Sequence, residues 1–409
     1  MENIQNKMLQ TAQELIQKTG QKLNLNQDEI DFIMQPDRVI EVKVPVLMAN
    51  GKIKTFVGYR SQHNNVLGPY KGGIRFHQNV SQEEIIALSI LMTLKCSANN
   101  LPLGGGKGGV IVNPKELSEL ELERLSRGYA KAISPFIGEE VDVPAPDVNT
   151  DGKIMMWMLD EYEKTINKKS PATFTGKPVE FGGSLGRTEA TGRGGVIVMN
   201  NLLKQLNKDY KTIAVQGFGN VGYYFAKIAS EKGYKIVAVS DSQGGIYYEN
   251  GLDPEKVMAV KKEQGSVINY PEGKVISNEE LLELPVDILV PAALENVITK
   301  DNASKIQAKV IIEMANGPIT ENSYPILENK GIISAPDILA NGGGVIVSYF
   351  EWLQNKKNEK WAEDEVNQKL EEQLTTAFNK IYAISQEFNT DLKEAAFLSA
   401  LAKITKKSI

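Results

Sequence analysis

The arrangement of apolar and polar residues gives the two halves of the chain different periodicities. Residues 38–60 alternate between apolar and polar positions on both sides of Asn50-Gly51, a dipeptide that favours tight turns, and so predict a β-hairpin. Apolar residues then recur at three- and four-residue intervals over 82–94 and 116–133, which predicts two amphipathic helices. The first half is therefore expected to mix helices and strands.

Beyond residue 195, short apolar runs alternate with helix-like segments. The runs cover residues 212–215, 236–239, 288–290, 310–312 and 332–334. This alternation is typical of a parallel sheet with helices on both faces. Residues 168–195, between the halves, are rich in Gly, Pro, Ser and Thr, as domain boundaries often are. We therefore predict two α/β domains: residues 1–181, with a helix at 390–409 packing back on them, and a doubly wound domain over 182–389.

The composition narrows the classes of protein that fit. The 409 residues carry a net charge of -5 and no cluster of lysines or arginines, so we expect no nucleic-acid partner. No stretch approaches the roughly 20 apolar residues of a membrane span, and residues 1–20 do not resemble a signal peptide, which predicts a cytoplasmic protein without a membrane partner. One cysteine, Cys96, and two histidines, His63 and His77, predict no disulfide and no metal site. Proton transfer would then fall to lysine and carboxylate.

One lysine stands inside a run of glycines, in the segment LPLGGGKGGVIV over residues 101–112. Glycine costs roughly 0.5–1 kcal/mol of stability in a regular element, so the glycines around Lys107 need a reason. A solvated surface turn is one interpretation. Because Pro102 and the apolar run from Val110 hold the segment at both ends, we favour a loop that closely approaches a ligand. A Walker A loop is excluded, because Gly108 stands where a Ser or Thr is needed.

Two further lysines and one aspartate stand in unusual settings. Lys95 lies on the apolar stripe of the first predicted helix, where it needs an anionic partner or must extend to water. Lys71 is flanked by glycines in GPYKGGIRF, and Asp147 follows two prolines in PAPDVNT. Ordinary roles as a turn lysine and a helix-start aspartate stay open for these two. Three lysines in such settings within 37 positions nevertheless suggest that they belong to one functional site.

A GxGxxG pattern follows the apolar run at residues 212–215 and precedes a helical segment. Its glycines, Gly217, Gly219 and Gly222, allow a tight turn and let a pyrophosphate approach the N-terminus of a helix. Asp241 ends the next apolar run, 24 positions after Gly217, where a carboxylate would accept hydrogen bonds from ribose hydroxyls. The pattern predicts a Rossmann-like, dinucleotide-binding domain, and a doubly wound domain without a nucleotide stays open.

The residues around Asp241 bear on the choice of dinucleotide. The charge of Asp241 would repel a ribose 2′-phosphate, which favours NAD over NADP. Ser240 and Ser242 could bind a phosphate if Asp241 turned away. NADP, or the use of both, therefore stays open.

Six segments, in this order, resemble the glutamate dehydrogenase family: GPYKGGIRF, LKCSANNLPLGGGKGG, PAPDVNT, GGSLGRTEATGRG, QGFGNVG and GGVIVSYFEW. They span nearly the whole chain. The GGGK and PAPDV segments are shared across the glutamate, leucine, phenylalanine and valine dehydrogenase superfamily, whereas Lys71 and Ser348 distinguish the glutamate enzymes. A lysine facing a leucine side chain would be a buried unpaired charge, so Lys71 favours an acidic substrate.

The resemblance implies reversible oxidative deamination of L-glutamate to 2-oxoglutarate and ammonium, with hydride transfer to NAD or NADP. The residues implied to bind substrate are Lys71, Lys95, Arg187 and Ser348, and those implied to catalyse are Lys107 and Asp147. The residues implied to face the cofactor are Thr191, Gly217, Gly219, Asn220, Val221, Gly222, Asp241, Ser242, Asn316 and Asn341. Loop capping is the ordinary alternative for the asparagines.

Individual roles follow from the same resemblance. Lys95 is expected to bind the α-carboxylate, and Lys71 and Ser348 the distal carboxylate. Lys107 activates water at the imine carbon, and Asp147 transfers protons. We expect Lys95 and the exclusion of water to lower the pKa of Lys107 toward roughly 7–8, the range that suits a lysine base.

Two other functions stay open on the sequence. One is a dehydrogenase for another amino acid, if Lys71 points away from the pocket. The other is a non-catalytic dinucleotide-binding regulator that keeps the fold. Members of the resembling family are commonly homohexamers, so the resemblance also implies a homohexamer.

Overall fold

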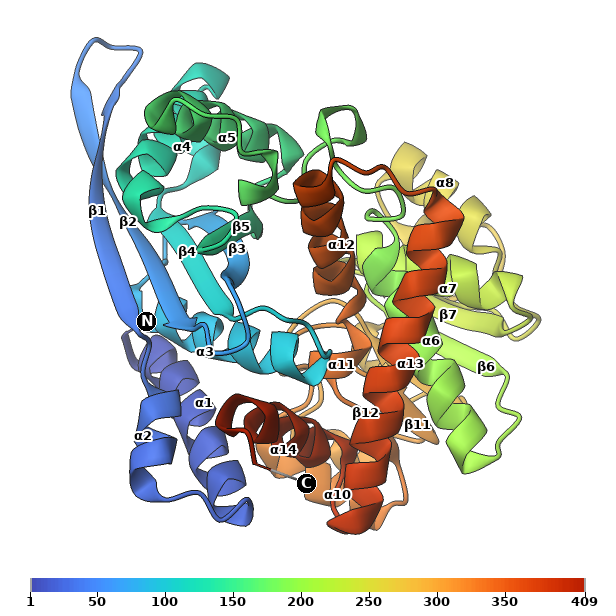
Figure 1. Ribbon diagram of the computed structural model, residues 1–409. Coiled ribbons are helices and arrows are strands. Elements are labelled where there is room, and N and C mark those ends of the chain that lie inside the picture. Colours follow the sequence, from blue (N-terminus) through green and yellow to red (C-terminus); the bar gives the residue numbers. More distant parts are fainter. Residues whose placement is uncertain (1, 408–409) are drawn as a thin grey trace. The chain divides into compact units, whose positions relative to one another are not determined.

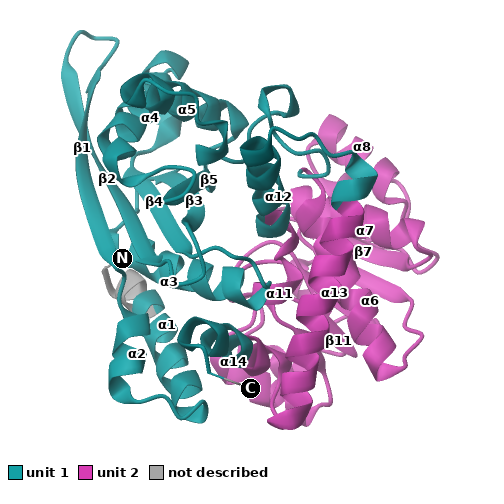
Figure 2. Ribbon diagram, in the orientation of Figure 1, with its two compact units in different colours: residues 1–187, 345–366, 397–409 teal, residues 188–344, 367–396 magenta. Residues whose placement is uncertain are grey.

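A computed structural model describes residues 2–407, with side chains from residue 8 onward (Figure 1). Residues 1 and 408–409, at the ends of the ranges predicted for the first domain, lie outside the described residues. The chain forms two compact units (Figure 2): unit 1 comprises residues 1–187, 345–366 and 397–409, and unit 2 comprises 188–344 and 367–396. The sequence-based boundary at residue 181 falls just before the observed crossing at 187. Residues 345–366, expected in the second domain, group with unit 1.

Unit 1 is built on a five-stranded mixed sheet in the order β1-β2-β4-β3-β5. The strands are β1 (Arg38–Leu47), β2 (Ile53–Asn64), β3 (Tyr70–His77), β4 (Gly105–Ile111) and β5 (Asp142–Pro146). β2 pairs antiparallel with β1 and β4, whereas β3 pairs in parallel with β4 and β5. The helices before the first crossing are α1 (Glu2–Lys22), α2 (Gln27–Met34), α3 (Gln82–Ala98), α4 (Glu119–Ile133) and α5 (Gly152–Ile166).

The predicted hairpin and both predicted helices are present. β1 and β2 pair along their whole length around a turn in which Gly51 adopts a φ of 77°. α4 begins at Glu119, later than the periodicity indicated, because Ser118 and Glu121 form a capping box at its N-terminus. The sequence signal at residue 116 belongs instead to a short 3₁₀ turn, Pro114–Glu116.

The core of unit 1 lies between the sheet and the helices α4 and α5. Ile74 and Phe76 of β3 and Val110 of β4 are fully buried there together with Tyr129 of α4 and Met155 of α5. α3 packs on the opposite face of the sheet, as its contacts with β4 described below show. The even-numbered positions of β3 therefore face the core, and its odd-numbered positions face α3.

Each of three C-terminal helices contains residues of both units. They are α12 (Gly343–Lys357), α13 (Glu363–Glu387) and α14 (Leu392–Thr405). Residues of α14 from Phe397 onward belong to unit 1, where the Ser97 hydroxyl donates a hydrogen bond to the backbone oxygen of Ala400 at 2.8 Å. α12 belongs to unit 1 from Val345 onward and carries the polar residues described below.

Unit 2 contains a seven-stranded sheet in the order β12-β11-β10-β6-β7-β8-β9. Its strands are β6 (Thr212–Gln216), β7 (Lys235–Asp241), β8 (Gly244–Tyr247), β9 (Lys274–Ile276), β10 (Ile288–Pro291), β11 (Val310–Ile312) and β12 (Ile333–Ala335). The strands from β12 to β7 are parallel, and β8 and β9 extend the sheet in antiparallel fashion. The helices of this unit include α6 (Ala190–Leu206), α7 (Asn220–Glu231), α8 (Pro254–Gln264), α9 (Asn278–Leu282), α10 (Tyr324–Asn329) and α11 (Asp337–Ala340).

The parallel strands confirm the predicted doubly wound α/β fold. Numbered by their place in the sequence, they lie in the order 2-1-3-4-5, which reverses direction between β6 and β10. Open α/β sheets bind ligands outside the carboxyl ends of the strands at such a reversal. Among the described residues, none of the helices combines the length and apolar character needed to cross a membrane.

Candidate active site

Lys107 lies on strand β4, so the expectation of a ligand-hugging loop is wrong. None of the five glycines around it adopts a positive φ. They are needed because neighbouring groups occupy the space of a side chain. A Cβ atom at Gly105 would lie 2.3 Å from the backbone nitrogen of Thr93 in α3, and one at Gly108 would lie 2.6 Å from the hydroxyl of Tyr129 in α4. The glycines let helices approach both faces of the strand that carries Lys107.

The register of β3, β4 and β5 gathers charged side chains on the face covered by α3. Arg75 pairs with Gly109, and Gly73 pairs with Ala145. Side chains two positions apart in a strand share a face. The charged residues that this register places together are Lys71, Arg75, Lys107 and Asp147. Lys107 lies on β4 and Asp147 directly follows β5, so the two residues of the sequence-predicted catalytic pair come from the strands on either side of β3.

One oxygen of Asp147 contacts two cations. The Oδ2 atom lies 2.9 Å from Nζ of Lys107 and 2.7 Å from Nε of Arg75. The helix-start role that stayed open for Asp147 is filled by Asp151, whose side chain caps α5 at the backbone N–H of Ile154. The carboxylate of Asp147 thus forms ion pairs with Lys107 and Arg75 and does not cap the helix.

The pKa values at this cluster are displaced by burial and by the neighbouring charges. Burial lowers the pKa of Lys107, Asp147 opposes this effect, and the positive charges of Arg75 and Arg60 lower it further. The expectation named Lys95 as the neighbouring charge, whereas the positive charges that lower the pKa here are those of Arg75 and Arg60. Burial alone would raise the pKa of Asp147, but the charges of Lys107 and Arg75 lower it to about 2. The resting pair therefore holds an ionised carboxylate beside a lysine that loses its proton easily.

A buried ion pair supports this arrangement from the other side of the strands. The Arg60 guanidinium contacts both carboxylate oxygens of Asp142, and both side chains are fully buried. Gln62 donates to the same carboxylate at 2.7 Å, and Arg60 donates to the backbone oxygen of Gly72 at 3.2 Å. These contacts tie β2 to β5 and β3, and so fix the strands that carry the charged cluster.

Lys71 and Ser348 meet at the hydroxyl of Thr175. Nζ of Lys71 donates to Oγ1 of Thr175 at 2.8 Å, and the same oxygen lies 2.6 Å from Oγ of Ser348. Lys71 is 1% exposed, and burial lowers its pKa to about 7. Thr175 is its hydrogen-bond partner among the described residues, whereas an ammonium can donate three hydrogen bonds. Lys71 therefore retains donor capacity for an anionic ligand, and the charge of such a ligand would favour its protonated form.

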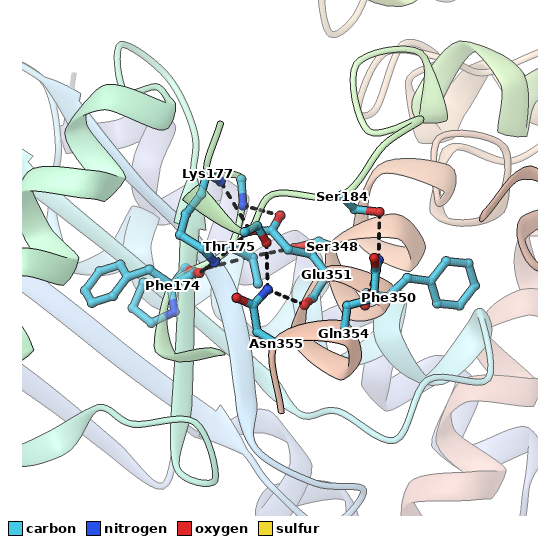
Figure 3. A network of polar contacts seen from close by, with 12 residues as sticks. Phe174, Thr175, Lys177, Ser184, Ser348, Phe350, Glu351, Gln354 and Asn355 are labelled. Carbon is cyan, nitrogen blue, oxygen red and sulfur yellow. Dashed lines mark hydrogen bonds and ion pairs between the residues drawn. The ribbon is translucent and has the colours of Figure 1, made fainter. Parts of the chain in front are cut away.

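A buried ion pair holds Thr175 and Ser348 in place (Figure 3). Nζ of Lys177 lies 2.8 Å from Oε1 of Glu351, with both side chains fully buried, and the N–H of Gly176 donates to Oε2 of Glu351 at 2.7 Å. Ser348 and Glu351 are three residues apart on α12 and share a helix face. The segment around Thr175 is thereby attached to α12.

Arg187 and Lys95 add positive charge to the surroundings of Lys71. Arg187 is half-buried, burial lowers its pKa, and its Nε atom has no hydrogen-bond partner among the described residues. Its charge acts on Lys71. Lys95, half-buried in the last turn of α3, acts together with Lys71 on the thiol of Cys96, whose pKa burial raises to about 12. The four predicted substrate-binding residues thus all lie in unit 1.

The predicted glycine turn is present between β6 and α7 in unit 2. Gly217 adopts a φ of 94°, and a Cβ atom at Gly222 would lie 1.9 Å from the backbone oxygen of Gly217. Gly219 caps α7, and a Cβ atom there would have no atom within 4 Å. The first glycine allows the turn, the third allows close packing, and the second leaves open space at a helix N-terminus, where a pyrophosphate fits.

Asp241 lies at the end of β7, as predicted, with its carboxylate already engaged. It accepts hydrogen bonds from the Ser266 hydroxyl and the N–H of Val267, both at 2.9 Å, and Nζ of Lys261 lies 3.4 Å away. Burial would raise the pKa of Asp241, but these partners and the N–H of Gln243 lower it. The carboxylate therefore stays ionised next to the glycine turn, where Lys261 also donates to the backbone oxygen of Phe218 at 3.1 Å.

Asn341 is bonded to the segment that carries Asn316. Its amide nitrogen donates to Oδ1 of Asn316 at 3.0 Å and lies 3.4 Å from the backbone oxygen of Met314. Its own Oδ1 atom is buried and has no hydrogen-bond partner among the described residues. A buried acceptor without a partner costs stability, so this atom is suited to a ligand N–H such as that of a carboxamide.

The remaining predicted cofactor residues lie around the glycine turn or next to Asp241. Asn220 begins α7, and its side chain donates to the backbone oxygen of Thr188 at 2.8 Å, which is a structural contact. Val221 follows it on α7 and is half-buried, as is Thr191 on α6. Ser242 is exposed just beyond the end of β7. All of them belong to unit 2.

Sequence reasoning missed three residues that organise this site. Arg75 stands four positions after Lys71 in a strand, and that even spacing was a usable signal for a shared face. Glu351 stands three positions after Ser348 in a helix, which was a second usable signal. Thr175 gave no local signal, because it meets Lys71 across 104 positions of sequence.

Two models of protein families match this chain. A family model described as "Glutamate/Leucine/Phenylalanine/Valine dehydrogenase" matches residues 182–409. A second, described as "Glu/Leu/Phe/Val dehydrogenase, dimerisation domain", matches residues 36–164. Together the two matches cover most of the chain.

Individual relatives match over almost their whole length. The chain is 50% identical over 406 residues to the NAD-specific glutamate dehydrogenase of Clostridioides difficile, covering 98% of this chain and 96% of that protein. The glutamate dehydrogenase structure from Peptoniphilus asaccharolyticus has a TM-score of 0.89 at 43% identity, covering 98% of both chains. The hetero-hexameric glutamate dehydrogenase from Thermus thermophilus, in a leucine-bound form, has a TM-score of 0.92 at 33% identity, covering 98% of this chain and 96% of that one.

Proposed function

The chain belongs to the glutamate, leucine, phenylalanine and valine dehydrogenase family. From that premise we propose which of its residues bind the substrate, transfer protons and bind the cofactor. It catalyses the reversible oxidative deamination of L-glutamate to 2-oxoglutarate and ammonium, with NAD as the hydride acceptor. The assignments of residues and domains that follow are proposals. Unit 1 binds and converts the substrate, and unit 2 binds NAD.

The observation that carries the substrate assignment is the buried ammonium of Lys71. A lysine with 1% exposure and a hydroxyl as its hydrogen-bond partner is a costly feature unless an anion binds there. We assign the distal carboxylate of glutamate to Lys71 and Ser348, with Thr175 holding both side chains in position. Lys95 binds the α-carboxylate, and Arg187 adds positive charge to the same region. A leucine or valine side chain would leave Lys71 without a counter-charge.

Lys107 and Asp147 carry the proton transfers. Because burial and the nearby arginines lower the pKa of Lys107, its neutral amine is accessible and can take a proton from water as that water attacks the imine carbon. Asp147 is ionised in the resting enzyme, which is the form that accepts a proton from the substrate ammonium. Asp147 then returns that proton to the amino group of the adduct formed by water attack, so that ammonia can leave. Lys107, whose Nζ atom lies 2.9 Å from Asp147, releases the proton taken from water.

The residues of unit 2 fit NAD. The open space at Gly219 accommodates the pyrophosphate at the N-terminus of α7, and the free Oδ1 atom of Asn341 accepts a hydrogen bond from the nicotinamide carboxamide. Asp241 remains ionised and disfavours a 2′-phosphate. When bound, NAD supplies the acceptor for the hydride that leaves the substrate Cα.

Replacing Lys107 tests the catalytic assignment. Lys107→Ala should abolish turnover of glutamate while the dissociation constant for NADH, measured by fluorescence titration, stays within about twofold. Lys115→Ala, at an exposed lysine just after the same strand, is the matched control and should retain activity. Substantial turnover in Lys107→Ala would remove the lysine mechanism.

Replacing Lys71 tests the substrate assignment. Lys71→Leu should lower kcat/KM for glutamate by about tenfold or more, the loss expected for a charged hydrogen bond, and should affect norvaline much less. An equal loss of kcat/KM for both substrates would mean that Lys71 does not bind the distal carboxylate. Reduction of NAD and NADP in parallel, with a panel of amino acids, would settle the cofactor preference.

We also propose that the enzyme is a cytoplasmic homohexamer. The hexameric relative from Thermus thermophilus and the match to a dimerisation domain support an oligomer of this size. Light scattering should then give about six times the chain mass of 45.1 kDa. Cell fractionation tests the location.

A further inference from the structure

A buried carboxylate that takes no part in the proposed chemistry stands three residues before Asn316. Glu313 directly follows strand β11 and is fully buried. Its oxygens accept hydrogen bonds from the Tyr324 hydroxyl at 2.9 and 3.1 Å and from the Ser334 hydroxyl at 2.5 Å. No lysine or arginine among the described residues forms an ion pair with it. An ionised carboxylate in this position has two neutral hydroxyl donors and no ion-pair partner among the described residues.

The charged groups around Glu313 leave it short of positive charge. Asp337 of α11 acts on it with like charge, and Lys393 of α14 with opposite charge. Lys393 is itself engaged elsewhere: its Nζ atom lies 2.6 Å from a carboxylate oxygen of Glu321 and 4.2 Å from the ring centroid of Tyr324. Three carboxylates thus surround one lysine. Burial, followed by the charge of Asp337, raises the pKa of Glu313 to about 8, while Lys393 and the hydroxyls oppose this.

The backbone connects Glu313 closely to Asn316, a residue of the proposed cofactor site. Three residues later stands Asn316, and the backbone between them is fixed. The N–H of Met314 donates to the oxygen of Pro291 at 3.0 Å, and the N–H of Gly317 donates to Oδ2 of Asp337 at 2.8 Å. Asn341 completes this frame through Asn316. Glu313 is therefore joined to Asn316 by a short segment whose backbone is hydrogen-bonded at both ends.

We propose that Glu313 is a positioning residue whose ionised form strengthens binding of the positively charged nicotinamide ring of NAD⁺ and whose neutral form is compatible with the uncharged ring of NADH. This inference rests on the proposed placement of the nicotinamide at Asn316 and Asn341. The physical basis is reciprocal linkage: if the carboxylate favours the cation, the bound cation favours the carboxylate. Binding of NAD⁺ then lowers the pKa of Glu313 and releases protons near neutral pH, whereas binding of NADH does not.

The linkage predicts a pH dependence with a defined sign. Glu313 is mainly protonated one unit below its pKa of about 8 and mainly ionised one unit above it. The affinity for NAD⁺ should therefore rise between pH 7 and pH 9 relative to the affinity for NADH. We expect the ratio Kd(NADH)/Kd(NAD⁺) to increase about fivefold over this range, the lower end of measured couplings between two sites.

Binding measurements on the unreacted enzyme test the proposal. Isothermal titration calorimetry of the full-length enzyme at pH 7, 8 and 9, in buffers of different ionisation enthalpy, gives both dissociation constants and the protons released. In Glu313→Gln the ratio should stay constant with pH and proton release on NAD⁺ binding should fall. Glu272→Gln makes the same chemical change at an exposed glutamate of unit 2 outside this cluster and should keep the pH dependence. A ratio that is constant in the unaltered enzyme, or unchanged in slope by Glu313→Gln, overturns the proposal.

A second variant keeps the test decisive if Glu313→Gln does not fold. Ser334→Ala removes one donor to the ionised carboxylate, so the pH transition should move to higher pH, and an unmoved transition would count against Glu313. Asn316→Ala and Asn341→Ala separate this inference from the proposed cofactor site. If both leave NAD⁺ affinity unchanged, the placement of the nicotinamide is wrong; if they weaken it while Glu313→Gln has no effect on the pH dependence, only the coupling is wrong.

Discussion

Nζ of Lys107 lies 2.9 Å from Oδ2 of Asp147, and the two residues come from neighbouring parts of one sheet in unit 1. The contact places the proposed base and the proposed proton carrier within direct transfer distance. Arg75 approaches the same oxygen at 2.7 Å, so the pair is in fact a triad of two cations and one anion. The charge of Arg75 lowers the pKa of both other members.

Arg75→Gln should shift the pH profile of glutamate oxidation upward. Arg75 lowers the pKa of both Lys107 and Asp147, so its removal raises both. The rate-limiting neutral form of Lys107 then appears only at higher pH, and the ascending limb of kcat against pH should move up by about one unit. Steady-state rates from pH 6 to pH 10 measure this shift. A reduced rate with an unmoved limb would indicate that Arg75 acts only by holding geometry.

Thr175→Val should weaken glutamate binding without abolishing catalysis. Valine keeps the volume but removes the oxygen that joins Lys71 to Ser348, so the ammonium loses its hydrogen-bond partner. We expect KM for glutamate to rise about tenfold, the equivalent of about 1.4 kcal/mol, with kcat nearly retained. Thr165→Val, at an exposed threonine of α5, serves as the control. A large loss of kcat with unchanged KM would contradict the role assigned to Thr175.

Glu351→Gln should destabilise unit 1 strongly. The change leaves the fully buried ammonium of Lys177 without its counter-charge, a loss that typically costs about 3–5 kcal/mol. The double change Lys177→Met and Glu351→Gln removes both charges and should recover much of this loss. Urea unfolding of the three proteins measures the difference. A double variant no more stable than Glu351→Gln would show that hydrogen bonds to Gly176, and not charge, dominate.

Asp241→Asn should relax the preference for NAD. The change removes the charge that repels a 2′-phosphate and frees Lys261, now 3.4 Å from that carboxylate, to contact a phosphate. The ratio of kcat/KM for NADP to that for NAD should rise about tenfold, the effect of one charged contact of about 1.4 kcal/mol. Asp209→Asn, the same chemical change at an exposed carboxylate, should leave the ratio unchanged. If both variants behave alike, Asp241 does not select the cofactor.

His63 should make the protein less stable in mild acid. Nε2 of His63 donates to the backbone oxygen of Ile33 at 2.8 Å, Nδ1 lies 2.7 Å from the Thr93 hydroxyl, and burial lowers the pKa to about 4. The unfolded chain, with a pKa of about 6.5, binds a proton below that pH and the folded chain does not, so stability is complete above about pH 6.5 and falls toward pH 4.

The size of the effect separates His63 from other acid-sensitive groups. Between pH 7 and pH 5 the protein should lose about 2 kcal/mol through this residue, and His63→Gln should remove that part of the pH dependence although it lowers stability at pH 7. Urea unfolding at several pH values measures both. An unchanged pH dependence in His63→Gln would place the acid sensitivity elsewhere.

Local patterns sufficed for much of the fold. The hairpin around Gly51, the helix α3 and the turn at Gly217 each depend on residues adjacent in sequence, so periodicity and turn chemistry predict them. Lys71 and Ser348 could be selected as a pair only through the family resemblance. That they share Thr175 could not be predicted, because the contact joins three segments that are brought together only by folding.

Strand β4 shows why local rules fail at this site. Five glycines lower the β propensity of the segment, so the sequence indicates a loop. The actual reason for the glycines lies in Thr93, Tyr129 and Arg60, which are remote in sequence and occupy the space of the missing side chains. Arg75 was overlooked for a related reason: its partner Asp147 lies 72 positions away.

The crowding around β4 has a consequence for mutational scanning of this enzyme. Positions 104, 105 and 108 should reject nearly every substitution, since even alanine at Gly104 would place its methyl carbon 2.0 Å from the backbone oxygen of Asn64. At positions 106 and 109 the nearest atoms would lie 3.2 and 3.0 Å from a Cβ atom, so only small side chains should be accepted there. A mutational scan would therefore mark the whole segment as sensitive to substitution, although Lys107 is its one residue proposed to be catalytic. Such a scan therefore reports the close packing around a catalytic residue as well as the residue itself.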